Sequence, residues 1–105
     1  MTTILLVDDD PHIRTLILET LAFATTCEIL TASDGREALA FEAEQPDLLL
    51  LDVNLEGELD GFAVCEQTRG WDPRPEVIFL SGRAHDQDVG RGLAAGACAY
   101  LTKPF

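Results

Sequence analysis

The stretch ILLVDDDPHI, residues 4–13, contains an apolar run that leads directly into three aspartates and a proline. The apolar residues Ile4–Val7 are typical of a short buried strand, because they leave no polar face for solvent. Asp8, Asp9 and Asp10 follow at once, and like charges this close together cost free energy, most of all beside an apolar interior. The three carboxylates therefore either point into water as an ordinary loop or surround a positively charged group.

The rest of the sequence alternates between short apolar runs and segments with the apolar spacing of helices. Strands are expected over Thr3–Val7, Glu28–Ala32, Asp47–Asp52, Glu76–Ser81 and Cys98–Thr102. Helices are expected from Pro11, with Asp10 as the N-cap, and over Ser33–Glu44, Gly61–Arg69 and residues 86–95. The run DLLLLD is apolar on both faces, which suits the middle of a parallel sheet. This β–α alternation predicts a doubly wound, five-stranded parallel α/β sheet.

Size and composition indicate a single acidic domain, residues 1–105. A chain of 105 residues can build one core, and no apolar run approaches the roughly 20 residues that a membrane helix needs. Lys and Arg number 7 against 19 Asp and Glu, and the resulting net charge of −12 argues against direct nucleic-acid binding. The N-terminus lacks the pattern of a signal peptide, so we expect a cytoplasmic protein without membrane attachment.

The cysteines and the C-terminus lead to two further expectations. Cys27, Cys65 and Cys98 are widely spaced among apolar residues, so we expect three buried, reduced thiols. Only KPF follows the last expected strand, so the chain is interpreted as truncated before the helix that would close the sheet. We expect the sheet face left exposed, together with the first helix, to be covered by another molecule in a homodimer.

Chemistry-bearing residues collect at the ends of the expected strands, where doubly wound sheets carry their sites. Asp8 and Asp9 end the first strand, Asp52 the third and Ser81 the fourth, while Lys103 follows the fifth. If the first and third strands are neighbours, the three carboxylates converge, and such a set of oxygen ligands favours Mg²⁺. A carboxylate nucleophile, a divalent cation, a hydroxyl and an ammonium group are what a transferring phosphoryl group requires.

Four motifs in this order resemble the receiver domain of two-component response regulators over essentially the whole chain. They are LLVDDD in the first strand, DLLLLDVNL followed by DG around the third, VIFLSG in the fourth and AYLTKPF in the fifth. The resemblance implies a flavodoxin-like sheet of strand order 2-1-3-4-5. It also implies a signalling domain of a phosphorelay, which changes its interaction surface on phosphorylation and promotes only its own phosphorylation and dephosphorylation.

The resemblance assigns the acidic residues to phosphoacceptor and metal roles. Asp52 is expected to accept a phosphoryl group from a phosphohistidine on a sensor histidine kinase or a histidine phosphotransfer protein. Asp9 and Asp52 are expected to bind Mg²⁺, with Asp8 helping directly or through water. The backbone carbonyl of Asn54 is expected to supply a further ligand.

The same resemblance assigns the switch and supporting residues. Lys103 is expected to contact the phosphoryl group, with Pro104 fixing its loop through a cis peptide. Ser81 occupies the position of the switch hydroxyl, and Tyr100 that of the aromatic side chain which turns inward when the hydroxyl moves. Gly82 fits the small residue that lets the phosphoryl group approach.

The segment DVNLEGELDG, residues 52–61, departs from the family pattern D-x-x-x-P-x-x-D-G. Glu56 replaces the proline, and one extra residue precedes Asp60, a longer turn that Gly57 could absorb. Two other functions remain open. A Mg²⁺-dependent phosphohydrolase with an aspartyl nucleophile would favour a carboxylate two residues beyond Asp52, where Asn54 stands. A degenerate receiver would serve as a constitutive protein-interaction module.

Overall fold

The sheet has the predicted architecture. The computed structural model describes residues 2–24, 27–53, 55, 57–81 and 99–102. Its strands are β1 (Thr3–Val7), β2 (Glu28–Ala32), β3 (Leu48–Asp52), β4 (Glu76–Ser81) and β5 (Ala99–Thr102). They form one sheet in the order β2-β1-β3-β4-β5, and every neighbouring pair is parallel. The fold is therefore the flavodoxin-like doubly wound sheet that the sequence indicated.

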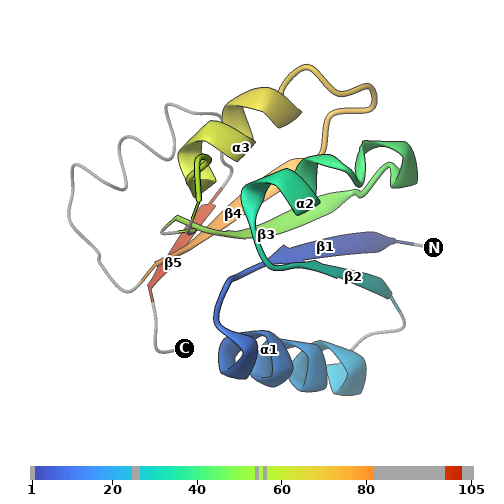
Figure 1. Cartoon of the computed structure of the whole chain (residues 1–105). Coiled ribbons are helices and arrows are strands. Elements are labelled where there is room, and N and C mark those ends of the chain that lie inside the picture. The colour runs from blue at the N-terminus through green and yellow to red at the C-terminus, as the bar shows by residue number, and fades with distance from the viewer. Residues whose placement is uncertain (1, 25–26, 54, 56, 82–98, 103–105) are drawn as a thin grey trace.

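Three α-helices flank the sheet among the described residues: α1 (Pro11–Ala24), α2 (Gly35–Leu39) and α3 (Gly61–Thr68). In Figure 1, α1 lies on one side of the sheet, while α2 and α3 lie on the other. None of the helices in the described ranges is long and apolar enough to span a bilayer. The expected helix over residues 86–95 lies outside the described residues.

The expectation of one helix over Ser33–Glu44 is wrong in extent. The Asp34 side chain accepts a hydrogen bond from the Glu37 N–H at 2.8 Å, so this N-cap makes the helix begin at Gly35. At its other end the N–H of Ala40 donates to both Arg36 O and Glu37 O, which tightens the last turn. A short 3₁₀ helix, Glu42–Glu44, follows, and Gln45 stops it with a left-handed φ of 50°.

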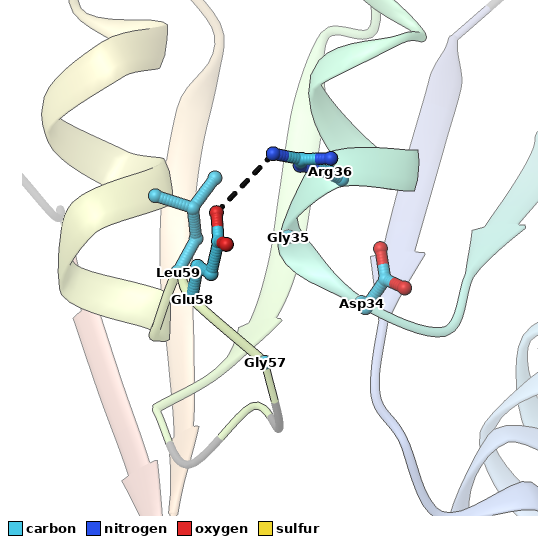
Figure 2. Close-up of a pocket in the computed structure, with 6 residues that line it drawn as sticks. All are labelled: Asp34, Gly35, Arg36, Gly57, Glu58 and Leu59. Carbon is cyan, nitrogen blue, oxygen red and sulfur yellow. Dashed lines mark hydrogen bonds and ion pairs between the residues drawn. The ribbon is translucent and has the colours of Figure 1, made fainter.

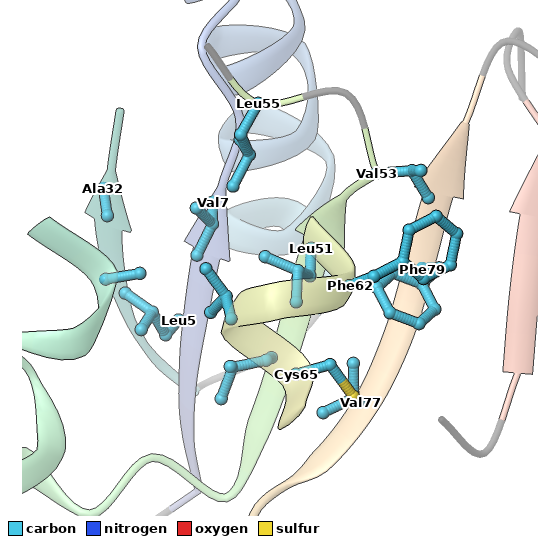
Figure 3. Close-up of a cluster of buried hydrophobic side chains, with 13 residues drawn as sticks. Leu5, Val7, Ala32, Leu51, Val53, Leu55, Phe62, Cys65, Val77 and Phe79 are labelled. Atoms are coloured by element: carbon cyan, nitrogen blue, oxygen red, sulfur yellow. The ribbon is translucent and has the colours of Figure 1, made fainter. Parts of the chain in front are cut away.

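The core lies on both faces of β3, because this strand is apolar on each side. Leu49 and Leu51 belong to a large cluster with residues of α2 and α3. Figure 3 shows Leu51 together with Phe62 and Cys65 of α3 in this cluster. The rings of Phe62 and Phe79 meet there with centroids 5.1 Å apart. Burying a side chain such as Phe79 stabilises the fold by about 1.5–3 kcal/mol. Leu50 faces the opposite side and packs with the smaller cluster beneath α1.

The α1 face also carries an apolar groove of about 250 Å³. It is lined by Leu16, Ile17, Thr20, Leu21, Leu50, Leu80 and Leu101. Leu16 and Leu101, two large apolar side chains of this groove, are 50% and 46% exposed. This is the surface on which a homodimer was expected, and that dimer stays a prediction.

The cysteines meet the expectation in part. Cys65 is a buried thiol in α3, as predicted. Cys27 is only half-buried, because it lies just before β2, an edge strand of the sheet, so its expected burial is wrong in degree. Cys98 lies outside the described residues.

The start of α3 approaches the end of β3 more closely than a side chain would allow. The Gly61 N–H donates to Val53 O at 3.0 Å. A Cβ at Gly61 would meet the carbonyl oxygen of Asp52 and would lie 2.8 Å from Val53 Cα. Glycine is therefore required at this contact between helix and strand.

We predict that Gly61→Ala lowers the free energy of unfolding by about 1–3 kcal/mol, because the added methyl group forces backbone apart. Urea denaturation followed by circular dichroism measures the change. Gly70→Ala is the matched control, since its Cβ would meet nothing closer than Gln67 O at 3.7 Å. The control should stay within about 0.5 kcal/mol of the parent. Equal stabilities of the two variants would contradict the steric explanation.

Candidate functional site

The pairing of β1 with β3 brings two of the predicted carboxylates together. Leu6 pairs with Leu50 and Val7 with Leu51, so the next residues along the two strands are Asp8 and Asp52. Because side chains alternate between sheet faces, Asp8 and Asp52 follow the face of Leu6 and Leu50. Both are buried, at 0% and 6% exposure. Parallel pairing thus places two poorly solvated carboxylates at the same end of neighbouring strands.

Asp9 completes an acidic cluster at this edge of the sheet. One carboxylate oxygen from each of Asp8, Asp9 and Asp52 lies within 4.8 Å of the other two. Asp9 is half-buried, so the cluster is more open to solvent on its side. Three acids at such distances repel one another, and a divalent cation would offset that repulsion. Carboxylate oxygens are the ligands that hard cations such as Mg²⁺ prefer, so the donor set fits such an ion.

The loop between β1 and α1 is held by hydrogen bonds to Asp8 and Asp10. The Asp8 N–H donates to Ala32 O at 3.2 Å, and Asp8 Oδ1 accepts from the Asp10 N–H at 2.9 Å. Asp10 Oδ1 in turn accepts from the His12 N–H at 2.9 Å, as an N-cap does. Asp10 is therefore the predicted helix cap, and its carboxylate is engaged at the helix start.

One contact of this loop was not predicted from the sequence. The Arg14 guanidinium donates through Nη1 to the backbone oxygen of Asp8 at 2.7 Å. The sequence offered one signal for this contact: Arg14 is the first Lys or Arg of the chain and stands one turn into a helix that follows three acids. That signal was not specific, because an arginine in this position of a helix most often extends into solvent.

The structure describes some of the other predicted residues and leaves the rest outside its described ranges. Ser81 is buried at the carboxyl end of β4, one residue beyond Leu80, which pairs with Asp52. The backbone of Tyr100, in β5, pairs with that of Phe79 in β4. The roles assigned to Ser81 and Tyr100 stay predictions. Asn54, Gly82, Lys103 and Pro104 are the predicted residues that lie outside the described ranges.

The longer loop between β3 and α3 turns at glycine, as expected. Gly57 has a φ of 100°, a conformation that side chains disfavour, and a Cβ there would meet no atom within 4 Å. Figure 2 shows Glu58 reaching across to Arg36 of α2, with an N–O distance of 3.2 Å. Both side chains are 81% exposed, so this ion pair adds little stability. Asp60 then caps α3 by accepting from the Ala63 N–H at 2.8 Å.

Cys65 in α3 carries a potential nucleophile, and its surroundings disfavour a reactive thiolate. Burial is the main cause that raises the pKa of the Cys65 thiol, and the neighbouring Glu66 carboxylate adds to it. Arg74 and Arg69 lower this pKa by smaller amounts. Because the thiolate is the reactive form, Cys65 is a core residue here and no candidate nucleophile.

Comparison with known proteins identifies relatives over almost the whole chain. The family model described as response regulator receiver domain matches residues 4–105. The alkaline phosphatase synthesis transcriptional regulatory protein PhoP of Bacillus subtilis is 43% identical over 103 residues, which cover 97% of this chain and 42% of PhoP. The transcriptional regulatory protein CseB of Streptomyces coelicolor is 46% identical over 108 residues, covering 99% and 44%. The chain thus spans less than half the length of these curated relatives.

A solved structure agrees with this result. The chemotaxis protein CheY4 of Vibrio cholerae superposes with a TM-score of 0.88 and 32% sequence identity. The superposition covers 100% of this chain and 88% of CheY4. The superposed part of this chain includes the strand ends where Asp8, Asp9 and Asp52 lie.

The repulsion within the acidic cluster leads to a prediction about stability. In EDTA, Asp9→Asn should raise the free energy of unfolding by about 1 kcal/mol, because one of three neighbouring charges is removed without loss of side-chain volume. Urea denaturation in low salt measures it. Glu44→Gln is the control, because it also removes one negative charge but lies on the exposed 3₁₀ helix, outside the acidic cluster. It should change the free energy of unfolding by less. A less stable Asp9→Asn variant in EDTA would refute the electrostatic account.

Proposed function

The chain belongs to the response regulator receiver domain family and is thus a module of phosphorelay signalling, and we propose that Asp52 is its phosphoacceptor. The observation that carries this proposal is the convergence of three carboxylate oxygens within 4.8 Å at the ends of β1 and β3. Two of these acids, Asp8 and Asp52, are buried, and a bound cation would offset the repulsion between their charges. The proposed donor is a phosphohistidine on a sensor histidine kinase or a histidine phosphotransfer protein.

In the proposed reaction a carboxylate oxygen of Asp52 attacks the phosphorus of the phosphohistidine. The O–P bond forms while the P–N bond breaks, and the electron pair of the broken bond stays on the imidazole nitrogen. The products are an aspartyl phosphate on this chain and an unmodified histidine on the donor. Asp52 is only 6% exposed, so few water molecules solvate the attacking oxygen.

Mg²⁺ is the proposed cofactor, and when bound it would supply positive charge against the phosphoryl oxygens. Asp9 and Asp52 would hold it, with Asp8 binding directly or through water. The backbone carbonyl of Asn54 is proposed as a further ligand on the strength of the family resemblance. An all-oxygen donor set supports Mg²⁺ over zinc or a softer metal.

The remaining residue roles are proposals that rest on the family motifs. Lys103 is proposed to offset charge on the phosphoryl oxygens, with Pro104 fixing the loop that carries it. Ser81 is proposed to move toward the phosphoryl group and donate a hydrogen bond to one of its oxygens. The Tyr100 ring is proposed to turn inward when the Ser81 hydroxyl moves. Gly82 would leave room for the phosphoryl group. The burial of the Ser81 hydroxyl at the end of β4 supports its role, because a buried donor gains from a charged acceptor.

The proposed output of the switch is binding. Receiver domains of response regulators are generally signalling modules, and we propose that this one promotes only its own phosphorylation and dephosphorylation. Asn54, at the position where a phosphohydrolase would favour a general acid–base carboxylate, weakens that alternative. Phosphorylation would bias a pre-existing equilibrium between two surface conformations.

Partners and location are proposals for the whole protein. PhoP and CseB are transcriptional regulators, and control of transcription is the corresponding proposal here. A net charge of −12 supports an output that this domain exerts without touching nucleic acid itself. The cytoplasm is the proposed compartment, because response regulators typically act there.

The phosphoacceptor assignment is tested with acetyl phosphate and Mg²⁺, followed by intact mass. The parent chain should gain one phosphoryl group, and Asp52→Asn should gain none, because the attacking carboxylate is lost. Asp47→Asn, just before the opposite end of β3, is the matched control and should react like the parent. EDTA should suppress the adduct in both reactive chains. An adduct that persists on Asp52→Asn would refute the assignment.

The role of Ser81 is tested separately from that of Asp52. We predict that Ser81→Ala still accepts the phosphoryl group but shifts the switch equilibrium of the phosphorylated chain by about ten-fold, the worth of one charge-assisted hydrogen bond. Chemical shift changes of β4 and β5 amides on phosphorylation measure that equilibrium. Shift changes equal to those of the parent would show that the hydroxyl plays no part.

A further inference from the structure

Arg14 makes a contact that the phosphoacceptor mechanism does not use. It lies one turn into α1, is half-buried, and reaches back over the loop between β1 and α1. Its Nη1 lies 2.7 Å from the backbone oxygen of Asp8, a short distance for an N–H···O hydrogen bond. A charged donor at this distance makes one of the stronger hydrogen bonds found in proteins.

The bonded oxygen belongs to the peptide group between Asp8 and Asp9. A peptide group is planar, so holding its oxygen fixes the orientation of the whole plane. The plane includes the N and Cα atoms of Asp9, so its orientation constrains where the Asp9 side chain can point. Asp9 is the least buried member of the acidic cluster, whereas Asp8 and Asp52 are held inside the protein. The direction of the Asp9 carboxylate thus depends on this loop, and Arg14 donates a hydrogen bond to the main chain of the loop.

We propose that Arg14 is a positioning residue, which orients the Asp8–Asp9 peptide and thereby holds the Asp9 carboxylate in the metal-binding arrangement. The inference rests on the proposed Mg²⁺ site. Residues that orient metal ligands through a hydrogen bond contribute substantially to metal affinity without touching the metal. Arg14 would act in this way through the main chain.

A second explanation for the Arg14 contact predicts the opposite change in Mg²⁺ affinity when Arg14 is replaced. If Arg14 served only as a counter-charge for the acidic cluster, it would repel a divalent cation, and its removal would strengthen Mg²⁺ binding. If Arg14 orients Asp9, its removal weakens Mg²⁺ binding even though a repulsive positive charge has gone. The direction of the change in affinity therefore separates the two roles.

The test is a calorimetric titration of the unphosphorylated chain with MgCl₂. Arg14→Gln should lower the affinity for Mg²⁺ on the order of ten-fold. Arg36→Gln is the matched control, because Arg36 is an exposed arginine of α2 whose loss changes the charge equally. Its affinity should equal that of the parent or lie slightly above it. An Arg14→Gln affinity equal to or above that of the parent would overturn the inference.

A measurement on the metal-free chain checks the positioning directly. The Asp10 N–H donates to Asp8 Oδ1 within this loop, and the Asp9 N–H belongs to the peptide that Arg14 holds. In EDTA, hydrogen exchange of these two amides should be faster in Arg14→Gln than in Arg36→Gln. Exchange rates unchanged from the parent would overturn the proposed orientation of the peptide.

Arg14→Lys is a second variant that tests the inference if Arg14→Gln does not fold. Lysine keeps the charge and most of the apolar stem but lacks the planar guanidinium, so its affinity for Mg²⁺ should also fall below that of the parent. Parent-like binding by Arg14→Lys together with tighter binding by Arg14→Gln would establish the counter-charge role instead. If the parent chain bound no Mg²⁺, the proposed metal site itself would be refuted. If the parent and both Arg14 variants bound Mg²⁺ equally well, the metal site would stand and only the positioning role of Arg14 would be refuted.

Discussion

The in-register pairing of β1 with β3 is the constraint on which the site depends. Leu6 beside Leu50 and Val7 beside Leu51 bury apolar surface on both faces of the sheet, and this burial sets the alignment of the two strands. The same alignment brings Asp8 next to Asp52. A slip of one residue would turn one carboxylate to the other face, so the hydrophobic core enforces an arrangement that electrostatics alone would oppose.

The loops at this edge are held by main-chain contacts that leave the acidic cluster in place. Asp10 and Asp60 cap the two helices whose first turns begin beside the cluster, and Gly61 lets α3 approach the end of β3 closely. Arg14 adds a bond across the first of these loops. Rigid strands and capped helices thus reduce the conformational freedom of the side chains that a phosphoryl group and a cation would meet.

Local patterns in the sequence predicted most of the fold. Strands β1, β2 and β4 were expected with the observed bounds, and β3 and β5 begin one residue later than expected. The helix expected over Ser33–Glu44 failed, because helical spacing of apolar residues does not reveal where backbone hydrogen bonds tighten into a 3₁₀ turn. Cys27 was less buried than expected, since its exposure follows from the edge position of β2, which is a property of the assembled sheet. Arg14 was missed because its partner is a main-chain oxygen, which no side-chain pattern marks.

The sequence by itself determined the class of fold and the chemical character of the site. Its apolar runs, caps and acids are local signals, and each depends on only a few neighbouring residues. These local signals left the meeting of Asp8 and Asp9 with Asp52 conditional on the first and third strands being neighbours, an order that the family resemblance implied. Only the tertiary structure decided that these carboxylates lie within 4.8 Å of one another and that two of them are buried. The physical reason is that strand order and register follow from burial of surfaces far apart along the chain, which no single segment encodes.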